Sequence, residues 1–240
     1  MKICDIHSHT LPGVDHGAEN METGLQMLRN AEASEVAYLA LTPHFDVADT
    51  PAELLWERMQ SQFALFQAAA KEIPVQLALG AEVHISPQLM DILEYLRLPT
   101  INGSRYLLTE FPVFYPENRF VPVLEKLLQQ NYIPLIAHPE RYLAVMQQPW
   151  ITEQWLDMGC HLQVTGGSLM GHNGKNIRQT AMELLQRDLV ACIASDAHGV
   201  RERTNYLMGV YDHLSVHFSK AYAQCLLERN PLRIWQDENL

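Results

Sequence analysis

Short apolar runs recur along the chain at regular intervals. Seven have the length of a strand, and they cover 2–6, 36–42, 75–83, 105–110, 132–138, 160–165 and 189–195. The stretches between them carry apolar residues at helical spacing, over 20–34, 51–72, 87–96, 118–130, 150–158, 174–187 and 217–229. In the second of these stretches, Thr50 and Pro51 predict an N-cap followed by a first-turn proline.

Strands that alternate with helices predict βα units and a parallel sheet. The units follow one another without a linker-like or low-complexity segment, which predicts a single domain over residues 1–240. We expect an α/β fold, a closed or nearly closed (β/α)7 barrel of TIM type, with an open doubly wound sheet as the alternative. No glycine-rich phosphate-binding motif follows any strand, so the nucleotide-binding folds lose their usual support.

Composition narrows the classes of function. The formal net charge of −11 argues against nucleic acid, or an anionic membrane surface, as the principal partner. No apolar run approaches the length of about 20 residues that spans a bilayer, and no signal-peptide pattern is present, so we expect a cytoplasmic protein. The four cysteines are scattered, which suits a reducing compartment and gives no disulfide or zinc-finger framework.

Histidine and acidic side chains, in one case with an arginine, follow six of the seven runs. They are His7, His9, Asp15 and His16 after the first run, His44 after the second, Glu82 and His84 at the third, Glu110 at the fourth, His138, Glu140 and Arg141 after the fifth, and Asp196 and His198 after the seventh. The sixth run ends in TGGS, a glycine turn with no evident ligand. In βα barrels the carboxyl ends of the strands carry the chemistry, so these side chains are predicted to face one cavity.

Each residue alone has an ordinary explanation as a helix cap, a solvated turn or a surface ion pair. Together they indicate a polynuclear metal site, because clustered carboxylates repel one another unless cations neutralise them. Imidazoles and carboxylates without cysteine suit Mn²⁺, Zn²⁺ or Fe, and the number of candidate ligands suits two or three ions. Nearby arginines (Arg141, Arg201 and Arg203) favour phosphoester hydrolysis, since a guanidinium grips phosphoryl oxygens through a bidentate fork.

An ordered set of motifs resembles a known family. The motifs are DIHSH, TPH, GAEVHI, LLTEFP, IAHPERY and SDAHG, which span residues 3 to 203. They resemble the PHP superfamily, named for polymerase and histidinol phosphatase domains, and within it the bacterial tyrosine-protein phosphatases of capsular and exopolysaccharide synthesis. The resemblance implies a distorted seven-stranded βα barrel.

The resemblance also implies three metal ions. His7, His9, Glu82 and Asp196 would hold the first; Glu82 as a bridge, with Glu110 and His138, the second; and His44 and His198, with a residue of the loop after His9, the third. Arg141 and Arg203 match the arginines that grip phosphate. Close relatives read Asp-Asp-Gly where this chain has Asp15-His16-Gly17, so His16 would replace a carboxylate at the third ion.

The function implied by the resemblance is an Mn²⁺-dependent phosphotyrosine-protein phosphatase, acting on a membrane-associated tyrosine kinase of polysaccharide export. Two alternatives are a phosphatase of small molecules, such as histidinol phosphate or a nucleotide, and a non-catalytic metal-binding regulatory barrel. A cysteine-dependent phosphatase is excluded, because no cysteine has an arginine six positions later. For the general acid the sequence offers Asp15 or a metal-bound water.

Overall fold

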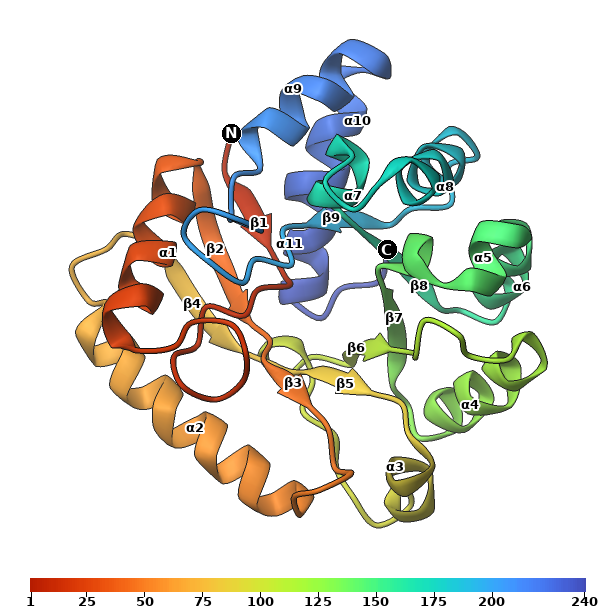
Figure 1. Ribbon diagram of the computed structural model, residues 1–240, viewed down its shortest axis with the longest axis horizontal. Coiled ribbons are helices and arrows are strands. Elements are labelled where there is room, and N and C mark those ends of the chain that lie inside the picture. Colours follow the sequence, from red (N-terminus) through yellow and green to blue (C-terminus); the bar gives the residue numbers. More distant parts are fainter.

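The computed structural model describes residues 1–240 as helices surrounding a central group of strands (Figure 1). The strands are β1 (Ile3–Asp5), β2 (Val36–Leu41), β3 (His44–Phe45), β4 (Gln76–Leu79), β5 (Glu82–His84), β6 (Tyr106–Glu110), β7 (Ile133–Ala137), β8 (His161–Thr165) and β9 (Cys192–Ala194). The helices are α1 (Met21–Ala33), α2 (Ala52–Ala69), α3 (Pro87–Ile92), α4 (Glu117–Gln129), α5 (Leu143–Gln147), α6 (Ile151–Asp157), α7 (Gly166–Met170), α8 (Lys175–Gln186), α9 (Met208–His217), α10 (Lys220–Gln224) and α11 (Asn230–Trp235). A π-helical segment, Cys225–Arg229, joins α10 to α11, and 3-10 turns cover Ile101–Gly103 and Pro139–Arg141.

Each of the seven apolar runs contains a strand, and every strand pair is parallel, as predicted. The pairing gives two sheets, however, in the orders β1-β2-β4 and β3-β5-β6-β7-β8-β9. The third run is divided at Gly80–Ala81, and the second is followed, after Thr42 and Pro43, by the additional short strand β3. Pro43 has no N–H to donate to a ladder, which accounts for the break between β2 and β3. The prediction of one closed seven-stranded barrel is therefore not confirmed.

Hydrogen bonds link the two sheets beyond the ends of their strands. Between the segments that follow β1 and β9, the His9 N–H donates to the Ala197 carbonyl and the Asp196 N–H donates to the His7 carbonyl, both at 2.9 Å, and Ser8 forms an isolated parallel bridge with Ala197. On its β2 side, the same segment accepts a hydrogen bond from the Thr42 N–H to the Ser8 carbonyl at 2.8 Å. The segment that follows β1 thus lies between the segments that follow β2 and β9, which brings polar residues from both sheets together.

Successive residues of the strands enter two different cores, as the period of two in a strand requires. In β6, Leu107 belongs to the large core that packs against the helices, while Tyr106 and Leu108 belong to a smaller core on the other face. Ile234 of α11 also belongs to the smaller core. The strands are therefore buried on both faces, which explains why their sequences read as continuous apolar runs.

The helices differ from the prediction in several places. Helix α2 begins at Ala52 with Pro51 as its cap residue, and no side chain caps it, so the cap expected from Thr50 is wrong. The TGGS turn is helix α7, whose first turn is capped by Thr165. A Cβ at Gly166 would lie 2.8 Å from Val210 of α9, so close packing explains a glycine in that helix. No helix combines the length and apolar character needed to cross a membrane.

Candidate metal centre

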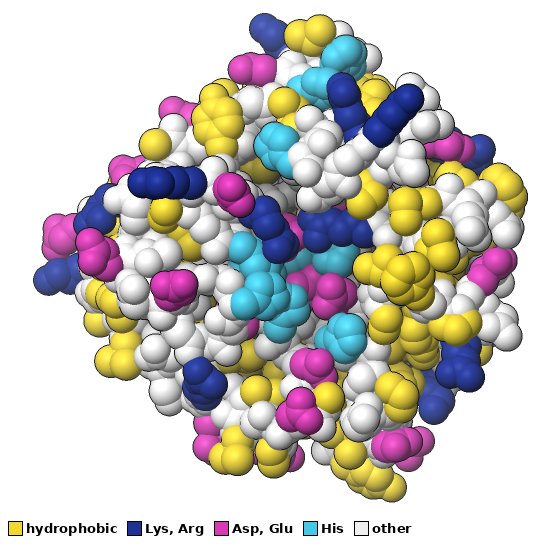
Figure 2. Space-filling model, viewed as in Figure 1, with side chains coloured by type: hydrophobic (Ala, Val, Ile, Leu, Met, Phe, Trp, Pro, Cys, Tyr) yellow, Lys and Arg dark blue, Asp and Glu magenta, His cyan; other side chains and the backbone are white.

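The polar residues predicted at the strand ends gather at the centre of one face of the molecule. Figure 2 shows histidine, acidic and arginine side chains clustered there. Two of the contributing residues, His138 after β7 and Asp196 after β9, have left-handed backbone conformations, with φ of 35° and 52°. Such conformations are unfavourable for residues other than glycine, and they persist where the surrounding structure holds a functional side chain in place.

Four buried side chains form the tightest group. Single ligand atoms of His7, His9, Glu82 and Asp196 all lie within 4.8 Å of one another. His7 Nε2 lies 3.3 Å from Glu82 Oε2 and 3.5 Å from Asp196 Oδ1, and His9 Nε2 lies 3.2 Å and 3.5 Å from the same two oxygens. Two imidazole nitrogens and two carboxylate oxygens thus converge on one point.

Glu82 connects this group to a second one. Its Oε2 lies 3.3 Å from His44 Nε2, and its Oε1 lies 2.8 Å from His138 Nε2. Glu110 stands on the far side of both imidazoles, 4.0 Å from His44 and 3.7 Å from His138. His84, the remaining histidine of this region, lies 3.2 Å from Glu110 through its Nδ1. A carboxylate with one oxygen on each side is placed as a bridging ligand would be.

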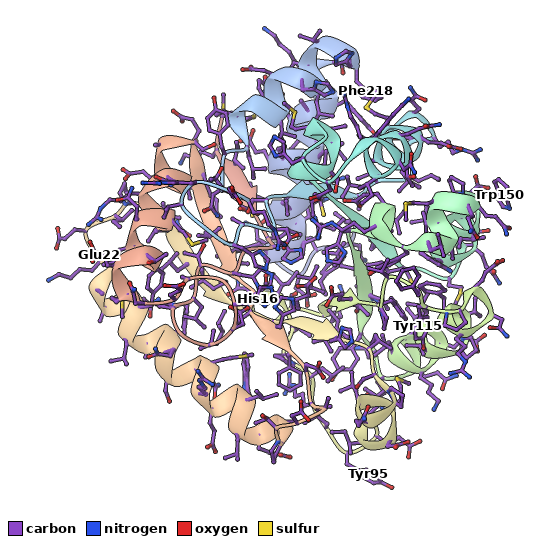
Figure 3. The ribbon with its side chains drawn as sticks, in the orientation of Figure 1. His16, Glu22, Tyr95, Tyr115, Trp150 and Phe218 are labelled. Carbon is purple, nitrogen blue, oxygen red and sulfur yellow. The ribbon has the colours of Figure 1, made fainter.

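A third group consists of His9, His44 and His198, which also offer ligand atoms within 4.8 Å of one another. His16 is not part of that group, although its exposed ring lies 4.6 Å from the ring of His44 and 4.8 Å from that of His198, between centroids. Figure 3 shows His16 near the centre of the face, on the loop after β1. Asp15 is also outside that group; its side chain contacts Nδ1 of His9 and accepts hydrogen bonds from the Gly17 and His44 N–H groups at 2.9 and 3.1 Å.

Hydrogen-bond acceptors around the cluster determine which nitrogen of each imidazole faces the cluster. His7 Nδ1 lies 2.8 Å from Gln163 Oε1, and His9 Nδ1 lies 2.7 Å from Asp15 Oδ2. Because both oxygens only accept, each Nδ1 carries the proton and each Nε2 presents a lone pair to the cluster. His198 Nδ1 donates in the same way to the Asp196 carbonyl oxygen at 3.0 Å. Metal-binding histidines are held in this manner by their second nitrogen.

Only some of the residues that hydrogen-bond to the candidate ligands and their neighbours were predicted from the sequence. Gln163 lies within the apolar run of β8 and was not predicted to take part. The signal it gave was an amide in a strand that is otherwise apolar and buried on both faces. Glu140, also buried, accepts hydrogen bonds from the Thr165 N–H and hydroxyl at 3.1 and 2.9 Å. Arg141 Nη2 donates to the same Thr165 hydroxyl at 3.2 Å.

Burial opposes charge on His7, His9, Glu82 and Asp196, yet their mutual pairing outweighs it, so the two imidazole pKa values are raised and the two carboxyl pKa values are lowered. Burial acts to lower the pKa of His7, but Glu82 and Asp196 raise it above its usual value. Burial likewise acts to raise the pKa of Glu82, but His7 and His138 hold it well below the usual range. His198 behaves differently, since burial and the charge of His9 lower its pKa to about 3.

Arg141 and Arg203 meet at the opposite oxygen of Asp196. Their Nη2 atoms donate to Asp196 Oδ2 at 2.7 and 2.8 Å, whereas Oδ1 of the same carboxylate faces His7 and His9. Arg141 is the more enclosed of the two, with a side chain 20% exposed against 42% for Arg203. Arg201, the third candidate, is exposed and makes no ion pair. Two guanidinium groups therefore border the cluster on one side.

The donor set fits divalent metal ions. In the neutral form with the proton on Nδ1, the Nε2 lone pairs of His7 and His9 face each other at 3.3 Å, beside carboxylate oxygens that also only accept. The buried Nε2 of His198 has no hydrogen-bond partner at all. Unpartnered buried acceptors are costly, and a cation satisfies several at once. Imidazole and carboxylate ligands without thiolate suit first-row divalent ions better than soft metals.

Comparison with known proteins agrees with this geometry. Residues 3–236 match the family described as "Capsular polysaccharide synthesis, CpsB/CapC". The tyrosine-protein phosphatase CpsB of Streptococcus pneumoniae is 30% identical over 243 residues, which cover 98% of both chains. The tyrosine-protein phosphatase YwqE of Bacillus subtilis is 28% identical over 228 residues, 95% of this chain and 90% of its own.

Solved structures agree as well. A crystal structure described under "YwqE from Bacillus subtilis and CpsB from Streptococcus pneumoniae, unique metal-dependent tyrosine phosphatases" superposes with a TM-score of 0.85 at 26% identity. The superposition covers 99% of this chain and 96% of the other. A lactonase from Listeria monocytogenes, 12% identical with a TM-score of 0.63, shares the fold alone. A family match over nearly every residue, together with relatives aligned from end to end, leads to one conclusion: the chain belongs to the CpsB/CapC family of capsular polysaccharide synthesis.

Proposed function

We propose that this protein is a metal-dependent phosphatase that hydrolyses phosphotyrosine in proteins. The observation that carries the proposal is the placement of Asp196, which joins the imidazole cluster through one oxygen and two arginines through the other. A phosphoryl group held by the arginines would lie beside the ligand cluster. The CpsB and YwqE relatives, named tyrosine-protein phosphatases, support the same activity.

The proposed ligands form three overlapping sets. His7, His9, Glu82 and Asp196 would hold one ion, Glu82, Glu110 and His138 a second, and His44, His198 and His16 a third. The position of His44 between Glu82 and Glu110 lets it serve the second set as well. We propose manganese as the native ion, with iron and zinc as alternatives that accept the same donors. When bound, such ions lower the pKa of a coordinated water and polarise phosphoryl oxygens.

The remaining site residues would bind the phosphoryl group or orient the metal ligands. Arg141 and Arg203 would grip the phosphoryl oxygens through charge-assisted hydrogen bonds and offset the negative charge of the transition state. Asp15 accepts from His9 Nδ1, and its pKa lies below the usual value, because the hydrogen bonds from His44 and His9 outweigh burial. A carboxylate that stays ionised has no proton to give. We therefore propose that Asp15 orients His9 and His44, in place of the general-acid role suggested by its position in the sequence.

The proposal also covers the domain organisation of the chain and its protein substrate. The large core includes residues of helices from α1 to α10, which supports one catalytic domain over residues 1–240, and the hydrogen bonds between the two sheets support a distorted barrel. As substrate we propose a membrane-associated tyrosine kinase of polysaccharide export, on the strength of the family's description.

A substrate panel tests the function. The protein, loaded with Mn²⁺, is assayed on phosphotyrosine peptides, phosphoserine peptides, histidinol phosphate and nucleotides, with a chelated sample as control. We expect chelator-sensitive hydrolysis that is fastest on phosphotyrosine peptides. A preference for histidinol phosphate or a nucleotide would replace the proposal by a small-molecule phosphatase. The absence of hydrolysis on every substrate would favour a non-catalytic regulatory barrel.

A further inference from the structure

A cavity of about 630 Å³ lies next to the cluster, between α7 and the segment that joins β9 to α9. Asp196, Arg141 and Arg203 line it on one side. Because Asp196 also faces His7 and His9, a single carboxylate separates this cavity from the metal ligands. None of the residues assigned to metal binding, Asp196 apart, lines the cavity.

The remaining walls of the cavity include an apolar surface. Met170 of α7, Tyr206 and Leu207 of the segment before α9, and Val210 of α9 contribute to it. Tyr206 is 62% exposed, so its side chain is accessible to a ligand in the cavity. Its ring lies directly over Gly209, where an added Cβ would come within 2.9 Å of Tyr206 Cε1. The absence of a side chain at Gly209 therefore leaves room for the Tyr206 ring beside the start of α9.

We propose that this cavity binds the aromatic ring of the substrate phosphotyrosine and that Tyr206 is the wall against which the ring packs. The inference rests on the proposed function and adds the residues that select an aryl phosphate. A phosphoryl group held by Arg141 and Arg203 sits at the boundary between cluster and cavity. The cluster side offers only polar, charged groups, so the ring of the substrate extends into the cavity. There the apolar wall removes the ring from water, and Tyr206 adds an aromatic contact.

The dimensions of the cavity also bear on selectivity. A phosphoserine side chain carries its phosphate on a single methylene and would leave the apolar wall uncovered. The volume of about 630 Å³ exceeds the space one ring needs and lies in the range of sites that hold larger ligands. The peptide segments on either side of the phosphotyrosine therefore have room to enter with the ring.

The test compares two ligands that differ by one ring. Phenylphosphonate carries an aryl group and cannot be hydrolysed as a phosphate ester, whereas inorganic phosphate has no ring. Calorimetry on the Mn²⁺-loaded protein gives the dissociation constant Kd of each. We expect Tyr206→Ala to weaken phenylphosphonate by about threefold to tenfold, the scale of an aromatic contact, with phosphate changed by less than about twofold. Tyr206→Phe keeps the ring and is expected to bind both ligands like the wild type.

A second variant narrows the cavity without removing a contact. A Cβ at Gly167 meets no atom closer than His172 Nδ1 at 3.7 Å, so the helix accepts Gly167→Leu, whose side chain would occupy the cavity. This variant is expected to weaken phenylphosphonate by about tenfold and to spare phosphate, as a steric block does. Tyr95→Ala, at a tyrosine 88% exposed far from the cavity, serves as the control (Figure 3).

Two results would overturn the inference. One is a wild type that binds phenylphosphonate no more tightly than phosphate, with the proposed activity intact. The other is a set of Tyr206→Ala and Gly167→Leu proteins that bind phenylphosphonate unchanged, or that lose both ligands equally. By contrast, a wild type that neither binds these ligands nor hydrolyses phosphotyrosine would contradict the proposed function itself.

Discussion

Replacing Arg141 or Arg203 by alanine is expected to reduce catalysis while leaving the metal content unchanged. The two guanidinium groups bind Asp196 Oδ2, whereas Oδ1 faces His7 and His9. The oxygen directed at the cluster therefore keeps its neighbours when either arginine is removed. What is lost is a charge-assisted contact to the phosphoryl group.

The magnitude follows from the exposure of each side chain. A hydrogen bond to a charged group contributes about 1.5 to 3 kcal/mol, with the larger values at sites shielded from water. Arg141 is 20% exposed and takes the upper value, which corresponds to a loss of about 10² in kcat/KM. Arg203 is 42% exposed, so solvent screening reduces its expected loss to about tenfold. Arg141→Lys keeps the charge but not the planar fork and should recover only part of the activity.

The assay is kcat/KM on a phosphotyrosine peptide at saturating Mn²⁺, with bound metal measured on the same samples. Arg187→Ala is the matched control, because Arg187 is 39% exposed and pairs with Glu153 and Glu183 on the protein surface. Arg141→Ala activity within about threefold of the wild type, at full metal content, would refute the role in phosphate binding. A parallel loss of metal and activity would instead assign the arginines to holding Asp196.

Three further outcomes are expected. Asp15→Asn should weaken Mn²⁺ binding by about 10- to 100-fold in a metal titration, since Asp15 holds His9 through Nδ1; an unchanged affinity would contradict that role. In urea unfolding of the metal-free protein, the free energy of unfolding should fall below about pH 4, because Glu82 and Asp196, whose pKa values are lowered in the folded state, then become protonated. It should also fall as the pH rises above 6.5, because His7 and His9, whose pKa values are raised, then lose their protons. A flat profile on either side would count against the pairing. Chelation should abolish activity while thiol alkylation spares it, because Cys4, Cys160 and Cys192 are buried and burial raises their pKa values; inactivation by alkylation, or trapping of a covalent phosphoenzyme, would overturn this expectation.

The sequence predicted the location of the cluster because parallel strands end on the same side. His7 and His9 stand two residues apart in an extended segment, and their Nε2 atoms meet as that spacing requires. Glu110, His138 and Asp196 end or follow other strands and reach the same place, as does Glu82, which lies near the end of its apolar run although it begins β5. The location of the cluster can therefore be predicted from the order of strands and ligands in the sequence, without knowledge of the side-chain contacts.

Other features depend on contacts that no local pattern contains. The interruption of the sheet at Pro43, and the backbone contacts by which residues 7–9 and 196–197 join the two sheets, are properties of pairing between distant segments. Helix α7 was read as a turn because its two glycines disfavour a helix, whereas the approach of Val210 is what requires Gly166. Gln163 could not be linked to His7 before β8 and β1 were placed in space.

The most direct test of the account is the metal content of Glu82→Gln. Glu82 is 1% exposed and faces His7, His9 and His44 through one oxygen and His138 through the other, so its loss should damage two sites together. Glu110→Gln, which alters a carboxylate 22% exposed at the edge of the cluster, is the matched comparison. After equilibration with Mn²⁺ and removal of free ion, we predict that Glu82→Gln retains at least one equivalent fewer than Glu110→Gln. A Glu82→Gln protein with the full wild-type complement of metal would contradict the bridging role and the three-set arrangement built on it.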